Sequence, residues 1–135
     1  MRFEKVYIEG LGYHLPENIV TSAEIENRLA PLYDRLKLPQ GRLELMSGIK
    51  ERRFWKKGVF PSEVATIAGE KAIVQSGINK DQIGCLISAS VCRDFLEPST
   101  ASVIHNNLKL PGEDFVFDVS NACLGVLNGM MIIPI

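Results

Sequence analysis

The feature that most constrains the fold is the apolar stretch FVFDVSNACLGVLNGMMII, which runs from Phe115 to Ile133. Its first five residues, Phe115 to Val119, have the length and composition of a short buried strand, and the residues after them predict a tight turn and an apolar helix. Cys123 lies where the turn becomes the helix. The free N–H groups and positive dipole end of a helix favour a thiolate there, so the stretch predicts a nucleophilic cysteine.

The alternative for Cys123 is an ordinary core residue. Cysteine is among the most buried residue types, and on these residues alone the packing interpretation is favoured. Against it, Ala122 and Gly125 are small enough for a thioester substrate to approach the thiol. The order strand, sharp turn, nucleophile and helix is that of the nucleophile elbow, but the G-x-S-x-G pattern is absent, which argues against a hydrolase of that fold.

Helices and strands alternate along the rest of the chain. Thr21 and Glu24 have the spacing of a capping box and predict a helix from about Ser22. The run CLISASV, Cys85 to Val91, has the length of a central strand covered on both faces. The alternation predicts an α/β fold with a mainly parallel sheet and helices on both faces. Other expected elements are a strand at 6–15 broken by two glycines, an amphipathic segment at 31–38, helices at 42–47, 61–76 and 100–108, and an extended segment at 49–55.

Composition excludes several classes of function. With 135 residues, 46% of them hydrophobic, the chain is expected to form one globular unit without an internal domain boundary. Fifteen basic and sixteen acidic residues give a net charge of −1 with no long run of one sign, so no nucleic-acid partner is expected. No apolar signal segment opens the chain, and residues 122–135 are fewer than the ~20 that span a bilayer, so we expect a cytoplasmic protein without a membrane span.

Cysteine and histidine positions do not indicate a metal site. The three cysteines form no CxxC pair, and the two histidines lie far apart in sequence, so neither zinc nor a disulfide framework is expected. Cys85 and Cys92, in or beside the predicted central strand, are interpreted as packing residues. No role is assigned to His14 or His105.

Three sequence blocks resemble the β-ketoacyl-ACP synthase III family of the thiolase superfamily. They are GYHLPENIVT at 12–21, GIKER at 48–52 and DVSNACLG at 118–125, in the family's order and at family-like separations. The resemblance runs along nearly the whole chain and implies that residues 1–135 are the N-terminal part of a thiolase-like domain. It implies an acyltransferase in which Cys123 is acylated by a thioester, followed by Claisen condensation with the carbanion of a second thioester.

A further block, SVCRDFLEPSTAS at 90–102, is similar to the olefin-forming acyl-CoA enzymes that condense two acyl chains head to head. In them a glutamate matching Glu97 comes from the partner subunit and is implicated as the base that forms the carbanion. An unactivated acyl thioester must lose an α-proton, whereas decarboxylation of a malonyl unit forms the carbanion without a base. Without the resemblance, Glu97 would be interpreted as a solvated loop carboxylate.

The resemblance also bears on the coenzyme. Synthases that start from acetyl-CoA commonly show W-x3-R-x-G-I before the GIRER block, with the tryptophan and arginine gripping the adenine. Arg42 and Met46 occupy those positions here, so the adenine clamp is not expected. Arg42 and Arg52 remain candidates for binding coenzyme phosphate. We expect no permanently bound cofactor, and acyl-CoA or acyl-carrier-protein thioesters as substrates.

The family's catalytic histidine and asparagine lie in a second half-domain, and family members are more than twice this length. Asn128 cannot replace that asparagine, because it follows Cys123 on the same helix. We therefore expect a truncated chain, inactive alone, whose complete form is a homodimer in fatty-acid or long-chain hydrocarbon biosynthesis. The alternative is a catalytically silent chain that acts as a structural or assembly partner of a complementary C-terminal half.

Overall fold

The computed structural model describes residues 4–133, and the chain divides into two compact units. The smaller unit is Leu15–Gly58, and the larger unit combines the residues up to His14 with those from Val59 onward. No change of composition marks the two points at which the chain passes from one unit to the other, so this division was not predicted from the sequence.

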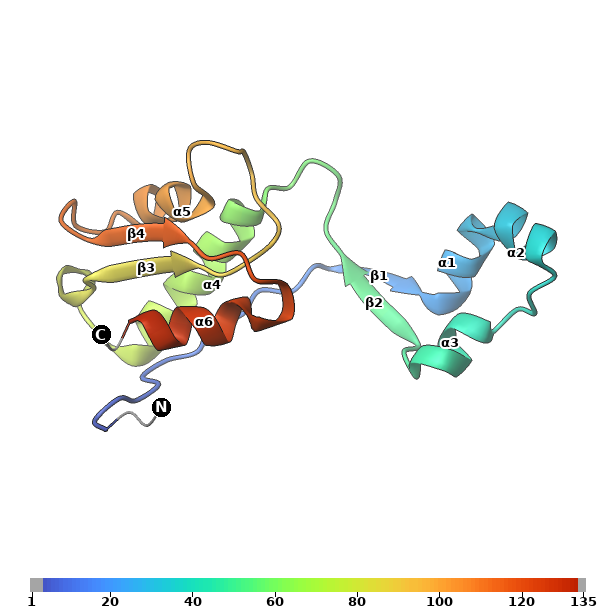
Figure 1. Cartoon of the computed structure of the whole chain (residues 1–135), viewed down its shortest axis with the longest axis horizontal. Helices are drawn as coiled ribbons and strands as arrows, with labels where there is room; N and C mark the ends of the chain where they lie inside the picture. The colour runs from blue at the N-terminus through green and yellow to red at the C-terminus, as the bar shows by residue number, and fades with distance from the viewer. Residues whose placement is uncertain (1–3, 134–135) are drawn as a thin grey trace. The chain divides into compact units, whose positions relative to one another are not determined.

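The smaller unit is built on an antiparallel strand pair with short helices between its strands (Figure 1). Asn18 lies opposite Phe54, and Thr21 lies opposite Glu51. The helices and the extended second strand agree with the sequence predictions, whereas the first strand and the pairing were not predicted. The elements are β1 (Asn18–Thr21), α1 (Ser22–Arg28), α2 (Ala30–Leu36), α3 (Arg42–Ser47) and β2 (Glu51–Phe54).

Local signals set the helix ends in this unit. The predicted capping box is confirmed: the Glu24 N–H donates to Thr21 Oγ1 at 3.1 Å, and the Thr21 N–H donates to the Glu24 carboxylate at 2.7 Å. Gly48, at φ +69°, ends α3 in the left-handed conformation that glycine adopts without steric cost.

A buried carboxylate holds the smaller unit together. Glu26, on α1, is 1% exposed and accepts hydrogen bonds from the backbone N–H groups of Leu43 and Gly41, both at 2.6 Å, and from the Tyr33 hydroxyl at 3.0 Å. The Leu43 bond is the main cause that lowers the pKa of Glu26. The carboxylate therefore stays charged inside the unit and ties α1 to the start of α3.

The larger unit is an α/β arrangement around a parallel strand pair. Cys85 lies opposite Phe115, and Ser88 lies opposite Asp118. Figure 1 shows α4 and α5 on one face of this pair and α6 on the other, which confirms helices on both faces. The elements are α4 (Pro61–Ser76), a 3₁₀ turn (Lys80–Gln82), β3 (Cys85–Ser88), α5 (Thr100–Leu108), β4 (Phe115–Asp118), a second 3₁₀ turn (Ala122–Leu124) and α6 (Gly125–Ile132).

The core of this unit centres on α5, whose Ala101, Ile104 and Leu108 are at most 6% exposed. The strand predicted at 85–91 is shorter than expected, because β3 ends at Ser88 and a loop follows. Within residues 4–133, β3 pairs only with β4, so the predicted central position is not observed there.

The strand predicted at 6–15 is wrong. Between residue 4 and the start of β1 the structure has no strand, and this segment runs along α4 instead. A Cβ atom on Gly12 would lie 2.0 Å from the Ala68 carbonyl oxygen, and one on Gly10 would lie 2.6 Å from that of Ala72. The two glycines therefore permit close backbone approach to a helix, rather than interrupting a strand.

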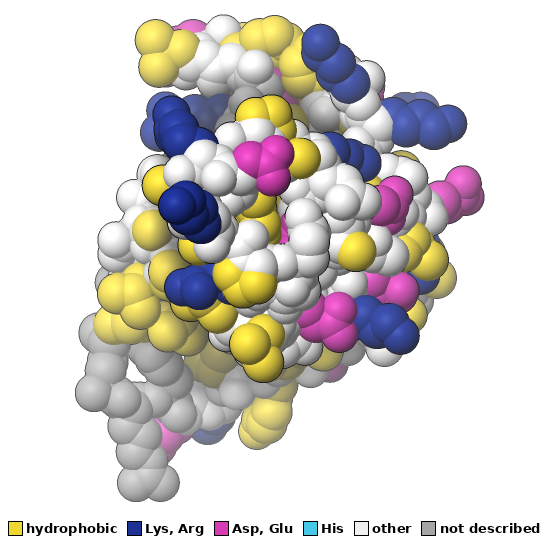
Figure 2. All heavy atoms as spheres, turned by 90° about the vertical axis from the view of Figure 1, so that its right-hand side faces the viewer, with side chains coloured by type: hydrophobic (Ala, Val, Ile, Leu, Met, Phe, Trp, Pro, Cys, Tyr) yellow, Lys and Arg dark blue, Asp and Glu magenta, His cyan; other side chains and the backbone are white. Residues whose placement is uncertain are grey.

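The surface carries mixed charge. On the face shown in Figure 2, basic and acidic side chains occur among hydrophobic and uncharged ones, and neither sign covers the face. Among the described residues, no helix combines the length and the apolar character that crossing a membrane requires.

Candidate active site

Cys123 occupies the position that the sequence predicted. It lies in the 3₁₀ turn after β4, directly before the first residue of α6. Its side chain is exposed, which does not fit the packing interpretation. The structure thus presents the thiol at the surface of the larger unit, at the entrance to an apolar helix.

The turn that carries Cys123 has an unusual backbone. Ala122, the residue before the cysteine, has φ +40°, in the left-handed region that residues with a Cβ atom rarely adopt. Such a conformation costs about 1–3 kcal/mol and persists only where the surroundings impose it. The Leu124 N–H donates to the Asn121 carbonyl at 2.8 Å, and the Asn121 side-chain amide donates to Asn128 Oδ1 at 2.5 Å.

The structure places the loop of Glu97 and the turn of Cys123 at the same edge of the strand pair. Because β3 and β4 are parallel, their carboxyl ends meet, and the Val119 N–H donates to the Ser88 carbonyl at 2.8 Å. Residues 89–99, which include Glu97, follow β3, and the cysteine turn follows β4. A Cβ atom on Gly125 would lie 3.6 Å from the carbonyl oxygens that follow β3 and β4, so α6 begins over both strand ends. This edge is where α/β sheets bind ligands.

Two aspartates anchor the Glu97 loop, and sequence reasoning missed both. Asp118, the last residue of β4, accepts the N–H groups of Thr100 and Ala101 at 3.0 and 2.7 Å. Asp94, within the loop, accepts the Ser62 N–H at 3.0 Å and donates its own N–H to Thr100 Oγ1 at 3.3 Å. The start of α5, three residues after Glu97, is therefore fastened to the strand that leads to Cys123. The sequence did contain a signal for Asp118: it is the only acidic residue in the apolar run FVFDV, and a carboxylate in a buried strand needs hydrogen-bond partners.

Known proteins of similar sequence are condensing enzymes. The chain is 43% identical over 131 residues to the acyl-CoA:acyl-CoA alkyltransferase of Shewanella oneidensis, covering 97% of this chain and 38% of that protein. It is 32% identical over 130 residues to the β-ketoacyl-[acyl-carrier-protein] synthase III of Chlamydia pneumoniae, covering 96% and 36% respectively. No protein-family model matches the chain.

Solved structures agree. Cerulenin-bound OleA of Xanthomonas campestris matches with a TM-score of 0.92 and 44% identity, covering 98% of this chain and 38% of that one. The chain belongs to the β-ketoacyl synthase III family. Synthase III (FabH) from Xanthomonas oryzae pv. oryzae matches with a TM-score of 0.93 and 44% identity, covering 99% and 40%. The fold is thus thiolase-like, and the chain spans about two fifths of the length of these relatives, at their N-terminal part.

The two arginines that the family resemblance suggested for coenzyme binding lie in the smaller unit. Arg42 is exposed at the first position of α3. Arg52, on β2, donates from Nη1 to Ser22 Oγ at 2.8 Å, and the Ser22 hydroxyl donates to the Ile49 carbonyl at 2.5 Å. Ser22 is 1% exposed, so Arg52 supports the start of α1. Coenzyme binding by either arginine stays a prediction.

The other cysteines differ from one another. Cys85 is half-buried on β3, and burial, followed by the charge of Asp114, raises the pKa of its thiol, which fits a packing residue. The interpretation of Cys92 as a packing residue is wrong, because its side chain is exposed in the loop after β3. Strand residues beyond Ser88 had been expected to be covered, but the chain leaves the sheet there.

Histidines contribute no metal site in the described part of the chain. His105 Nε2 lies 3.1 Å from Asp114 Oδ2 and 2.9 Å from the Pro111 carbonyl, which fastens α5 to the turn before β4. Among residues 4–133, no group of three or more histidine, cysteine, aspartate or glutamate side chains could hold a metal ion.

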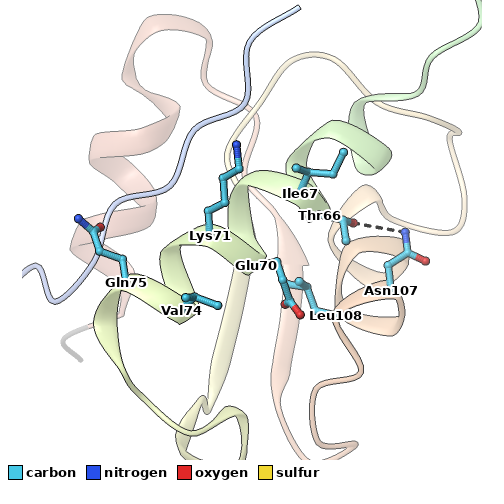
Figure 3. A pocket seen from close by; sticks show the side chains of 8 residues that line it. All are labelled: Thr66, Ile67, Glu70, Lys71, Val74, Gln75, Asn107 and Leu108. Carbon is cyan, nitrogen blue, oxygen red and sulfur yellow. Dashed lines mark hydrogen bonds between the residues drawn. The ribbon is translucent and has the colours of Figure 1, made fainter.

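A hollow of about 540 Å³ lies on α4 and α5 (Figure 3), and Cys123 is not among its lining residues. Its polar residues are engaged locally: the Asn107 amide donates to Thr66 Oγ1 at 3.3 Å, and Lys71 Nζ donates to the Tyr13 carbonyl at 3.1 Å. Neither Glu97 nor the nucleophile turn contributes to it, so it is not the family's reaction site. Its lining residues are Thr66, Ile67, Glu70, Lys71, Val74, Gln75, Asn107 and Leu108.

Proposed function

We propose that the complete protein is an acyltransferase that condenses two acyl thioesters through an acyl intermediate on Cys123, with Glu97 as the base for the second substrate. One observation carries this proposal: an exposed cysteine at the turn from β4 into α6, in a chain 43% identical to an acyl-CoA:acyl-CoA alkyltransferase. The turn from the parallel strand β4 into α6 supports the nucleophile, because it places Cys123 at the carboxyl end of the strand pair.

The reaction has two steps. The Cys123 thiolate attacks the carbonyl carbon of the first acyl thioester, a bond to Sγ forms, and the coenzyme or carrier thiolate leaves. Glu97 of the partner subunit, across the proposed dimer interface, then removes an α-proton from the second thioester. The resulting carbanion attacks the acyl carbon on Cys123, the bond to Sγ breaks, and a β-keto thioester is released with the cysteine thiolate regenerated. The remaining part of the protein is proposed to supply the histidine and asparagine that stabilise the oxyanion.

Variants of a relative support the choice of Glu97. Solved variants of Xanthomonas campestris OleA carry substitutions of a glutamate and of a cysteine. These two residues are as far apart in that sequence as Glu97 and Cys123 are here. We therefore propose head-to-head condensation of acyl-CoA, in a cytoplasmic homodimer that serves long-chain hydrocarbon synthesis, with Arg42 and Arg52 near the coenzyme phosphates. Decarboxylative condensation with a malonyl thioester is the second candidate, favoured by the identity to synthase III.

Acylation of Cys123 is the direct test. The chain is incubated with a long-chain acyl-CoA, alone and mixed with the C-terminal part of the Xanthomonas campestris relative, and the peptides are examined by mass spectrometry. We expect an acyl adduct on the peptide containing Cys123 and none in Cys123→Ala. The exposed Cys92 is an internal control for non-specific transfer. Absence of the adduct in both preparations would refute the proposal in favour of a catalytically silent assembly partner.

Glu97 is tested in the same mixture. Replacement by glutamine is expected to stop condensation while leaving the acyl adduct on Cys123 intact, because only the second step needs the base. Unchanged turnover in Glu97→Gln would refute the role of Glu97 as the base. Product formation that strictly requires malonyl thioester, with release of carbon dioxide, would refute head-to-head condensation in favour of the decarboxylative reaction.

A further inference from the structure

A side-chain amide pair spans the turn that carries the nucleophile. The Asn121 amide nitrogen donates to Asn128 Oδ1 at 2.5 Å. Asn121 directly precedes the 3₁₀ turn, and Asn128 is the fourth residue of α6. The bond therefore joins the two sides of the turn, with Cys123 between them in sequence.

Asn128 is an unusual residue for its helix. The sequence of α6 is GVLNGMMI, in which Asn128 is the only polar side chain. It is half-buried, whereas the neighbouring Val126 and Leu127 are 60% and 56% exposed. Its side-chain oxygen accepts the bond from Asn121, whose own side chain is exposed. The amide therefore turns back toward the nucleophile turn, while its apolar neighbours are exposed.

The turn needs an external restraint. Ala122 holds φ +40°, a conformation that a residue with a Cβ atom leaves unless its surroundings impose it. One backbone bond, from the Leu124 N–H to the Asn121 carbonyl, closes the turn from within. The amide pair adds a second tie across the same residues, outside the backbone.

We infer that Asn121 and Asn128 are positioning residues that hold the nucleophile turn so that Cys123 is presented to its acyl donor. This role rests on the proposed acylation of Cys123, and it adds the hydrogen bond that orients the turn carrying the thiol. The pair does not contact the substrate in this assignment, since it acts through the conformation of residues 122–124. Its loss should therefore slow acyl transfer without weakening acyl-CoA binding.

Two measurements on the 135-residue chain, in the acylation mixture described above, test this role. The first is hydrogen exchange of the turn amides, chiefly Leu124, whose N–H bond closes the turn. The second is the rate of acylation of Cys123 as a function of acyl-CoA concentration. Asn121→Ala and Asn128→Ala are each expected to speed the exchange and to lower the maximal acylation rate by about 2- to 10-fold, the loss of one hydrogen bond, with half-saturation unchanged.

Controls separate positioning from general destabilisation. Asn107→Ala removes another side-chain amide bond of the larger unit, one that joins α5 to α4 and involves no residue of the turn, and should leave both measurements unchanged. The double variant of Asn121 and Asn128 should be no slower than either single one, because both substitutions break the same bond. Effects of Asn128→Ala no larger than those of Asn107→Ala, or additive effects in the double variant, would overturn the assignment. If wild-type Cys123 takes no acyl group, the proposed function fails, while hydrogen exchange still decides whether the pair holds the turn.

Discussion

Replacing Asp118 by alanine should weaken the attachment of the start of α5, which follows the Glu97 loop, to β4, the strand that leads to Cys123. Asp118 accepts the backbone N–H groups of Thr100 and Ala101 at 3.0 and 2.7 Å, and these residues are 2% and 0% exposed. The alanine variant leaves both donors buried without their acceptor. It also removes a negative charge from the N-terminus of α5, where the helix dipole favours one.

The magnitude follows from the two lost bonds. A buried donor without an acceptor costs about 1–3 kcal/mol, so two donors cost about 2–6 kcal/mol in the free energy of unfolding. Asp118→Asn keeps one acceptor oxygen and should lose about half as much. A domain is stable by only about 5–15 kcal/mol, so the alanine variant is expected to be severely weakened.

Urea denaturation followed by circular dichroism measures the stability, and hydrogen exchange of peptides from α5 locates the loss. Asp81→Ala is the matched control, because Asp81 is exposed in the same unit and its replacement should change stability by less than about 0.5 kcal/mol. The expected order of stability is wild type, Asp118→Asn, Asp118→Ala. An alanine variant as stable as the control, with unchanged exchange in α5, would show that the Asp118 bonds do not hold the start of α5 to β4.

Two further predictions concern the N-terminal segment and the smaller unit. Gly12→Ala should detach residues 4–14 from α4, because its Cβ atom would lie 2.0 Å from a helix carbonyl oxygen. Proteolysis of this segment should therefore become faster. Gly84→Ala is the control and should behave as wild type, because the space around Gly84 is open. For Glu26, the lowered pKa means that its contribution is complete above the ordinary carboxyl pKa of about 4.5 and is lost as pH falls through the lower folded value. Glu26→Gln should therefore lower the stability of the smaller unit at neutral pH and make that stability depend less on pH in the acid range. Fluorescence of Trp55, the single tryptophan, measures the unfolding. An acid unfolding profile equal to that of wild type would contradict this assignment.

Much of the secondary structure was predictable because its signals are local. The capping box of Thr21 and Glu24, Pro61 at the start of α4, and Gly48 and Gly77 at helix ends each act within one turn of backbone. The prediction of a strand at 6–15 was wrong because a strand depends on a distant partner and not only on local signals. Its residues are compatible with extended structure, but a strand exists only with a partner, and these residues lie against α4.

In the candidate site, too, the features set by local sequence were predicted and those set by distant contacts were not. Cys123 was placed at the turn into α6 from a strand pattern and a few small residues, and the family resemblance then suggested its chemistry. Cys92 was misjudged, because exposure depends on where β3 ends and not on the apolar character of the run. The hydrogen bonds that Asp118 accepts from the Thr100 and Ala101 N–H groups were missed, since these partners are 18 and 17 residues away in sequence, respectively.

By itself, the sequence determined most helix boundaries, the turn that carries the cysteine, and membership of the condensing-enzyme family. Only the tertiary structure decided that β3 and β4 are parallel neighbours, and hence that the Glu97 loop and Cys123 share one edge. It also decided that Asn128 turns to Asn121. The physical reason is range: caps, turns and propensities act over a few residues, whereas strand pairing and side-chain contacts depend on which distant segments the whole chain brings together.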